Sequence, residues 1–404
     1  MSFEFFLAKR FLSGQRLGFF RLVTTAIAIG GTALGVAALL ITLAVMDGFQ
    51  SDIQQKILGT QPQVVVSNAV GGTLANDSVV SDQLSHFDNV AAVAPYMYGQ
   101  ALVEAGSTVT GIMIRGIIPN EEDHVTETGH ILTQGTWSSL TENTAVVGEE
   151  LARTLSIHTG DTISLIVPEA GAQVLNQLPR IRKFKVVGMF RSGMYEYDAN
   201  LIYLKLQGAQ DLLGLQNRIT GYGLRLKNVD DYPKTTVQIQ NILGIAYWTR
   251  SWQDMNKNLF SALKLERTVM FLILTLIILV SSFTIISNLL LLTIEKAREI
   301  GILQAIGASP RQIGKIFLFN GLLLGGTGVS LGLLFGVGIS ALLKKYPLIR
   351  LPADVYYIDK LPIKLSLTTI ESVGICAFSL VLLSVLYPAW KASQMDPIQA
   401  IRQG

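Results

Sequence analysis

The side chains that most often do chemistry in proteins are few in this chain and lie far apart. The 404 residues include one cysteine, Cys376, and four histidines, His86, His124, His130 and His158. No two histidines have the His-x-x-x-His spacing that binds zinc, and no Cys-x-x-Cys is present. A single cysteine cannot form an intrachain disulfide. These residues therefore predict neither a metal site nor a thiol-based active site.

The sequence also lacks a nucleotide-binding loop. Gly314-Lys315 comes nearest to a P-loop, but Ile316 follows where the motif needs Ser or Thr, and Ser309 replaces its first glycine. The long apolar runs contain no ionisable residue, which a proton or ion relay through a membrane would require. We therefore expect this chain to be neither an enzyme nor an ion-coupled transporter, and to bind no cofactor itself.

The composition separates lipid-embedded from water-exposed parts. Half of the residues are apolar and 15% are charged, whereas a soluble domain has about 25% charged residues. The net charge of +3, with no dominant basic stripe, predicts no nucleic-acid partner. Four uncharged runs are each about 20 residues or longer, the length needed to cross a bilayer. These predicted spans are residues 22–46, 268–294, 316–343 and 372–390.

Basic residues set the predicted orientation. Four of them precede the first span, at Lys9, Arg10, Arg16 and Arg21, which indicates a cytoplasmic N-terminus. Four spans then return the C-terminus to the same side. The amphipathic segment 1–21, the connection 295–315 and the tail 391–404 are therefore expected in the cytoplasm. Residues 47–267 and the short loop 344–371 are expected outside, although that loop carries several lysines.

The large external segment has the composition of a soluble domain. Runs rich in Val, Ile and aromatic residues predict strands at 63–67, 90–103, 109–117 and 183–190. Helix-like stretches lie between them at 149–155 and 206–213. The predicted fold is four transmembrane α-helices with a large external α+β domain between the first and second helices.

Turn and cap residues predict a sharp elbow after the second span. Residues 295–306 form a short amphipathic helix, Gly307 suits its C′ position, and Ser309-Pro310 suits the start of the next helix. This helix would either rest on lipid headgroups or dock a cytoplasmic partner. Thr368–Glu371 predicts a capping box for the fourth span. Glycines at 321, 325, 328, 332 and 336 predict close helix packing.

These motifs together resemble a known family. Residues 295–311, Glu-Lys-Ala-Arg-Glu-Ile-Gly-Ile-Leu-Gln-Ala-Ile-Gly-Ala-Ser-Pro-Arg, and the closing Tyr387-Pro-Ala-Trp-Lys-Ala-Ser resemble ABC-transporter permeases of the macrolide-exporter and FtsX type. Met46-Asp-Gly-Phe-Gln, Gly193-Met-Tyr-Glu-Tyr-Asp and residues 351–362 resemble the lipoprotein-releasing (Lol) permeases of the LolC/LolE family more closely. The resemblance covers almost the whole chain.

The resemblance implies partners and sites. The partners would be two cytoplasmic ATPase subunits that bind ATP and Mg, a second permease copy or paralogue, a lipoprotein substrate and a periplasmic carrier, in the bacterial inner membrane. The elbow would be the helix that couples to the ATPase, through Glu295, Arg298, Glu299, Ile302, Leu303, Ile306 and Gly307. A carrier-binding hairpin would include Pro168, Leu175, Leu178, Pro179, Arg180 and Arg182. Whether the chain is LolC-like or LolE-like stays open at this point.

The physics of the cargo requires a shielded path. Three acyl chains contain roughly 45 methylenes, and exposing them to water would cost roughly 35 kcal/mol at about 0.8 kcal/mol each. Apolar stripes continue past the outer ends of the first two spans. We expect eight residues of these stripes to line an acyl cavity between two permeases: Leu40, Leu43, Met46, Phe49, Phe260, Leu263, Met270 and Phe271. Ordinary helix packing explains the same stripes equally well.

Two other functions fit the same architecture. A drug or peptide exporter permease of the macrolide-exporter type would usually carry its ATPase on the same chain. A scaffold like FtsX would transmit the state of an ATPase to a cell-wall hydrolase and move no substrate, and its external part would usually be shorter.

Overall fold

The computed structural model describes residues 3–13, 19–106, 108–168, 179–346 and 361–395. The chain divides into two compact units, which are treated separately below. The helical unit comprises Met1–Ser51, Ser261–Arg350 and Lys360–Gly404, and the α+β unit comprises Asp52–Phe260 and Leu351–Asp359.

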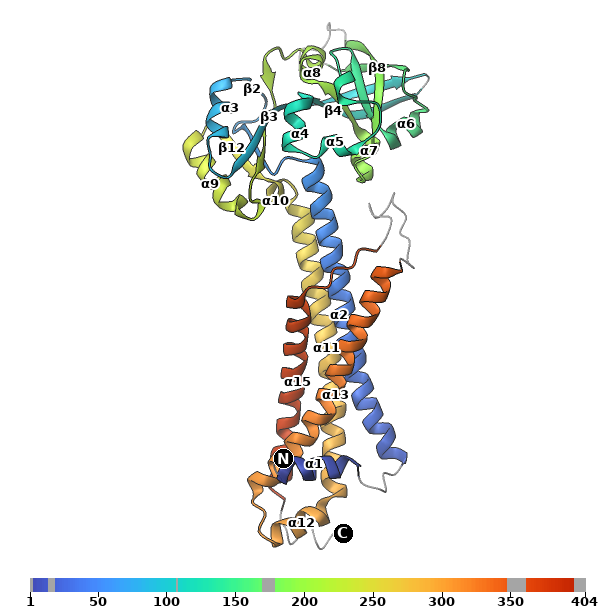
Figure 1. Ribbon diagram of the computed structural model, residues 1–404, viewed down its shortest axis with the longest axis vertical. Helices are drawn as coiled ribbons and strands as arrows, with labels where there is room; N and C mark the ends of the chain where they lie inside the picture. The colour runs from blue at the N-terminus through green and yellow to red at the C-terminus, as the bar shows by residue number, and fades with distance from the viewer. Residues whose placement is uncertain (1–2, 14–18, 107, 169–178, 347–360, 396–404) are drawn as a thin grey trace. The chain divides into compact units, whose positions relative to one another are not determined.

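Four long helices dominate the described part of the helical unit (Figure 1). The helices are α1 (Phe3–Ser13), α2 (Phe19–Thr60), α11 (Lys257–Glu295), α12 (Ala297–Ala305), α13 (Pro310–Lys345) and α15 (Leu367–Ser393). Each of α2, α11, α13 and α15 is long and apolar enough to cross a membrane. These four helices, with the α+β domain between the first two, confirm the predicted fold class. The helices α2 and α11 extend well beyond the predicted spans 22–46 and 268–294.

Glycines bring α13 close to two neighbouring helices. A Cβ added at Gly325 would lie 2.1 Å from Val381 Cγ1 of α15, and one at Gly321 would lie 2.4 Å from Val385. Gly332 instead faces α2, where an added Cβ would lie 2.7 Å from the carbonyl oxygen of Ala33. Because both faces admit only hydrogen at these positions, the predicted packing role of the glycines is confirmed.

The α+β unit contains twelve described strands with short helices between them. The strands are β1 (Val64–Asn68), β2 (Leu74–Ala75), β3 (Val90–Ala105), β4 (Thr108–Ile117), β5 (Leu132–Gln134), β6 (Thr144–Gly148), β7 (Thr162–Val167), β8 (Arg180–Phe190), β9 (Leu201–Lys205), β10 (Arg218–Ile219), β11 (Gly221–Leu226) and β12 (Tyr247–Ser251). The helices are α3 (Ser78–Ser85), α4 (Pro119–Val125), α5 (Thr128–Ile131), α6 (Glu149–Leu155), α7 (Tyr195–Asn200), α8 (Leu206–Leu213), α9 (Tyr232–Leu243) and α10 (Trp252–Met255). Helices α6 and α8 have the bounds predicted from the sequence.

Ten of the strands form one sheet that closes on itself. Strands β3, β4, β9, β6, β8 and β7 pair in that order, and β7 pairs again with β3, so six strands make a ring. The long strand β3 leaves this ring at its N-terminal half and pairs with β11, which continues the sheet through β1 to β12. The ring removes exposed strand edges from one half of the unit.

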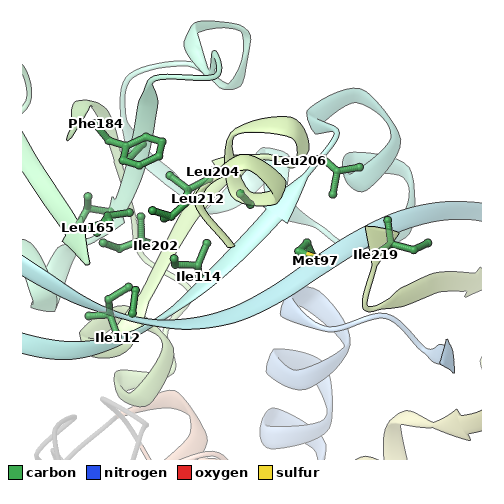
Figure 2. Packing of buried hydrophobic residues seen from close by; sticks show 14 of the residues in the cluster. Met97, Ile112, Ile114, Leu165, Phe184, Ile202, Leu204, Leu206, Leu212 and Ile219 are labelled. Atoms are coloured by element: carbon green, nitrogen blue, oxygen red, sulfur yellow. The ribbon is translucent and has the colours of Figure 1, made fainter. Parts of the chain in front are cut away.

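Buried hydrophobic residues fill the centre of this unit, and Figure 2 shows part of that cluster. Its members come from strands on several sides of the ring and from α8, and the labelled ones are Met97, Ile112, Ile114, Leu165, Phe184, Ile202, Leu204, Leu206, Leu212 and Ile219. A smaller aromatic cluster lies around Tyr203, whose ring makes edge contacts with Phe190 at 5.0 Å and Trp137 at 5.3 Å between centroids. These close-packed clusters make the sheet a rigid support for the loops that connect its strands.

Candidate functional sites

The elbow after α11 has the caps that the sequence predicts. Helix α12 starts directly after Lys296, and Gly307 follows its end with a φ of +107°, a conformation that favours glycine. The side chain of Ser309 accepts a hydrogen bond from the backbone N–H of Gln312, whose own side chain accepts from the N–H of Ser309. This capping box starts α13 at Pro310. The turn between the two helices is therefore closely defined.

The two faces of α12 have different surroundings. Ile300 is fully buried, and Leu303 packs against the interior cluster of the helical unit. Ile302 and Ile306 point away from that cluster and are 48% and 77% exposed. One face thus fixes α12 to the bundle, and the other presents two isoleucines.

The charged residues of the predicted coupling set lie at the N-terminal end of α12 or just before it. Glu299 forms an ion pair with Lys296 one turn earlier, and Arg298 is exposed. Glu295 is the last residue of α11 and is also exposed. These charges would border a partner that covers Ile302 and Ile306.

The acyl-cavity residues of α2 divide into a covered pair and a half-exposed pair. Leu40 and Leu43 are 0% and 4% exposed, and Leu40 packs against Gly336 of α13. Met46 and Phe49, further along the helix, are half-buried. An acyl chain can therefore contact Leu40 and Leu43 only when these helices separate.

The predicted residues of α11 also differ from one another. In the helical unit, Leu263 is buried, Met270 is 37% exposed, and Phe271 packs against the interior cluster. In the α+β unit, the ring of Phe260 makes an edge contact with Trp252 at 5.0 Å between centroids. Met270 is the most accessible of the eight predicted cavity residues.

The predicted carrier-binding hairpin is described only at its base. Leu175 and Leu178 lie outside the described residues, whereas Pro168, Pro179 and Arg180 are exposed. Pro168 borders a cavity of about 430 Å³ that Leu102 and Met113 also line.

Arg182 lies in β8 beside this base. It donates to Asp211 at 3.1 Å and to Asn143 at 2.9 Å, and its guanidinium lies 5.7 Å from the centre of the Phe184 ring. These three contacts position Arg182 on the sheet surface.

A buried arginine, which our sequence reading did not identify, fixes the end of α2 in the α+β unit. Arg115 is fully buried at the end of β4 and donates from Nη1 to the carbonyl oxygen of Thr60 at 3.0 Å. Thr60 is the last residue of α2, so its carbonyl has no partner within the helix. Arg115 also donates to the hydroxyl of Tyr98 at 3.1 Å and pairs with Glu122, which accepts from Thr126 at 3.1 Å.

The electrostatics of this pair explain why the charges persist in the core. Burial, the largest single effect, lowers the pKa of the Arg115 guanidinium, but the Glu122 carboxylate and the neighbouring tyrosines together raise that pKa above its ordinary value. Burial also raises the pKa of Tyr98 to about 12, so the hydroxyl stays protonated. The tyrosine rings of Tyr96 and Tyr98 lie 5.7 and 5.4 Å from the guanidinium.

Neighbouring residues complete the attachment of this helix end. The backbone N–H of Glu127 donates to the carbonyl of Gly59 at 2.9 Å. The side chain of Gln61 donates to the hydroxyl of Tyr197 and accepts from Asn256 at 3.2 Å. Asn256 directly precedes α11, so one glutamine connects the end of α2 with the start of α11. We call these contacts, with the Arg115 pair, the helix-end joint.

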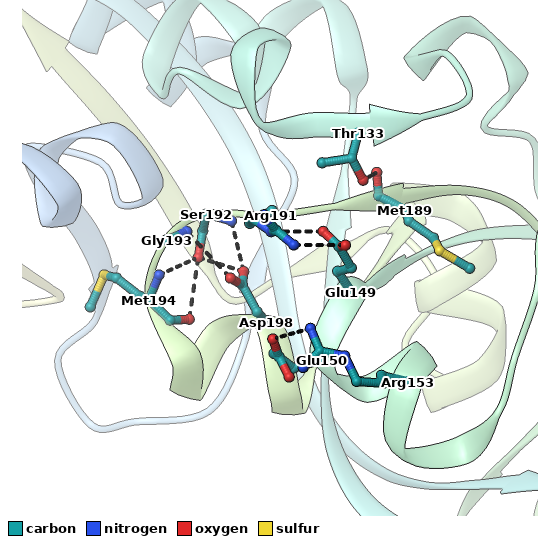
Figure 3. Close-up of polar contacts among 10 residues, drawn as sticks. All are labelled: Thr133, Glu149, Glu150, Arg153, Met189, Arg191, Ser192, Gly193, Met194 and Asp198. Carbon is teal, nitrogen blue, oxygen red and sulfur yellow. Dashed lines mark hydrogen bonds and ion pairs between the residues drawn. The ribbon is translucent and has the colours of Figure 1, made fainter. Parts of the chain in front are cut away.

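The family-like motif at 193–198 forms the turn before α7 and the first residues of that helix (Figure 3). Asp198 is 4% exposed and accepts from the N–H and hydroxyl of Ser192, both at 2.7 Å, and from the N–H of Gly193 at 3.3 Å. Burial raises the pKa of Asp198, and the hydrogen bonds from Ser192 and Gly193 oppose that shift. The turn places Met194 Sδ 3.8 Å from the hydroxyl of Thr60. Asp198 thereby holds the turn that carries Met194 against the end of α2.

The described residues contain no group of three His, Cys, Asp or Glu side chains placed to hold a metal ion.

Two family models match successive parts of the chain. The model for the MacB-like periplasmic core domain matches residues 25–242, and that for the FtsX-like permease C-terminal matches residues 271–397. With four spanning helices and an α+β domain between the first two, these matches define the class as a transmembrane permease of the FtsX type.

Curated relatives match along nearly the whole length. The lipoprotein-releasing system transmembrane protein LolC of Neisseria meningitidis serogroup B is 32% identical over 416 residues, 99% of each chain. LolC of Xylella fastidiosa is 32% identical over 96% of this chain and 95% of its own. LolE of Haemophilus influenzae is 27% identical over 99% of each. The chain belongs to the LolC/LolE family of lipoprotein-releasing permeases.

Proposed function

We propose that this chain is the permease subunit of an ATP-driven complex that extracts lipoproteins from the outer leaflet of the inner membrane. The complex passes them to a periplasmic carrier for sorting to the outer membrane. The observation that carries this proposal is the 32% identity to a lipoprotein-releasing LolC protein over 99% of both chains. The macrolide-exporter and FtsX-like alternatives have less support, because the relatives described above carry lipoprotein-releasing names.

The proposal assigns partners and orientation. Two ATPase subunits bind ATP and Mg in the cytoplasm and dock on α12, and a second permease copy or paralogue completes the membrane part. The chain itself is non-catalytic and holds no cofactor. The N- and C-termini lie in the cytoplasm, and the α+β unit lies in the periplasm. The basic residues before the first span, Arg10 among them, support this orientation.

Depletion of the chain tests the function directly. We expect outer-membrane lipoproteins to accumulate in the inner membrane, because exposing their acyl chains to water without a shielded path would cost roughly 35 kcal/mol. Fractionation of the two membranes after depletion measures this, and the control is re-expression of the intact chain. Normal sorting in depleted cells would contradict the proposal, and selective drug sensitivity would favour the exporter alternative.

A photo-cross-linker at Met270 tests the acyl path. Because Met270 is 37% exposed on an apolar helix, we expect it to capture lipoprotein at least fivefold more than Leu40, which is fully buried beside α13. The adduct is measured by immunoblotting for a lipoprotein after irradiation. Equal, background-level capture at both positions would place the path elsewhere.

A further inference from the structure

One helical turn of α2, just after its apolar run, contacts α11, α15 and the segment that leads into α15. Asp47 is the first ionisable residue after the uncharged run 22–46, and Arg267 is the last one before the uncharged run 268–294. Asp47 therefore lies where the apolar run of α2 ends, and Arg267 lies where the apolar run of α11 begins. The function described so far uses neither of them.

Asp47 binds two helices with its two carboxylate oxygens. Its Oδ1 lies 3.1 Å from Nη1 of Arg267 in α11, and its Oδ2 accepts a hydrogen bond from the hydroxyl of Thr369 in α15 at 2.7 Å. The side chain of Asp47 is 12% exposed and that of Arg267 is 45% exposed. One carboxylate thus joins α2, α11 and α15.

The segment that leads into α15 lies across the same turn. A Cβ at Gly48 would lie 2.3 Å from the carbonyl oxygen of Pro362, so only glycine permits this approach. The N–H of Lys364 donates to the carbonyl of Ala44 at 3.0 Å, and its ammonium donates to the hydroxyl of Ser51 at 3.1 Å. Asp47 and Gly48 of the family-like motif at 46–50 therefore both hold neighbouring segments.

We propose that Asp47 is a positioning residue for lipoprotein release, and that its contacts with Arg267 and Thr369 break and re-form in each transport cycle. We call these two contacts the Asp47 clasp. The proposal rests on the proposed function, because the clasp lies beside Met46 on α2 and one turn before Met270 on α11, two of the predicted acyl-contact residues.

The chemistry of the clasp suits a reversible closure. A carboxylate exchanges its partners for water when helices move apart, whereas packed aliphatic residues would leave apolar surface exposed. The Arg267 side chain is 45% exposed and the Asp47 side chain 12% exposed, so water must reach Asp47 when the helices part and replace the lost contacts. The clasp can thus release α11 and α15 without unfolding either helix.

A reversible cross-link tests this role. The variant is Asp47→Cys/Thr369→Cys with the one native cysteine removed by Cys376→Ser, assembled in the complete complex in proteoliposomes. Transfer of lipoprotein to the soluble carrier is measured after oxidation and again after reduction. We expect oxidation to reduce transfer at least tenfold relative to the same variant kept reduced, and reduction to restore that level. The reduced variant lacks both clasp contacts, so it should itself transfer less lipoprotein than the Cys376→Ser chain. Equal transfer in both states, or failure of the pair to cross-link, would overturn the proposal.

Two further measurements separate this proposal from the proposed function. The single variants Asp47→Cys and Thr369→Cys, each with Cys376→Ser, should show no change on oxidation. The rate of disulfide formation, measured without lipoprotein, should fall at least threefold during ATP turnover because the clasp is then partly open. An unchanged rate would overturn the clasp. Absence of transfer by the unmodified complex would contradict the proposed function alone.

Discussion

Replacement of both Ile302 and Ile306 by aspartate is expected to abolish ATP hydrolysis stimulated by lipoprotein, while the permease stays folded. Both side chains are about half exposed or more and lie on the face of α12 that does not contact the bundle. The proposed docking of the ATPase on this face would bury both aspartates in the interface without a partner for their charges. The measurement is ATPase activity of the assembled complex with and without lipoprotein, and we expect at least a tenfold loss of stimulation.

The controls distinguish docking from folding. Ile245→Asp changes an isoleucine that is 97% exposed in the α+β unit, and it should leave stimulation unchanged. Leu303→Ala should instead lower the thermal stability, because Leu303 packs against the interior cluster. If Ile302→Asp/Ile306→Asp retained full stimulation, α12 would not be the docking helix.

Replacement of Arg115 by methionine is expected to destabilise the α+β unit by about 3–5 kcal/mol, the range for breaking one side of a buried ion pair. The variant leaves the Glu122 carboxylate, which is 1% exposed, without its cation, and removes the donor to the Thr60 carbonyl. The measurement is the denaturant-induced unfolding of the full chain in detergent, with tryptophan fluorescence as the signal that reports unfolding.

The chain offers a matched control for this prediction. Arg153 pairs with Glu150 at 2.7 Å, but its side chain is 65% exposed, so Arg153→Met should cost no more than about 1 kcal/mol. The second variant Arg115→Met/Glu122→Leu should recover part of the loss, since no buried charge then stays unpaired. A loss below about 1 kcal/mol for Arg115→Met would mean that water reaches the pair.

The sequence predicted the elements whose determinants are local. Uncharged length identified the four spanning helices, and the Gly307 and Ser309-Pro310 signals predicted the turn before α13 correctly. The predicted start of the short helix at 295 is wrong, because Glu295 still belongs to α11 and α12 begins at Ala297. The capping box predicted at Thr368–Glu371 is wrong. The helix already begins at Leu367, with Ser366 as N-cap and no side-chain cap bond. The predicted cap residue, Thr368, therefore lies in the first turn, where its hydroxyl forms a hydrogen bond with the hydroxyl of Ser366.

Sites made by distant residues escaped the sequence reading. Arg115 in an alternating strand looks like any exposed basic residue, because its partners Thr60 and Glu122 are set by the fold. The apolar stripe of α2 could not separate Leu40, which is covered, from Met46, which is half-buried. Periodicity identifies a helix face, but the neighbours of that face depend on how the other helices pack.

The eight glycines of α13 have a consequence for how the protein is made. In water each glycine weakens a helix by about 1 kcal/mol relative to alanine, so this segment has little tendency to become helical by itself. In lipid, unpaired backbone groups are so costly that the segment must form a helix once inserted. Insertion into the bilayer should therefore precede the close contacts of Gly325 and Gly332. Biogenesis of this permease would then proceed from single inserted helices to a packed bundle, and an error in assembly would leave a helix exposed to lipid but still intact.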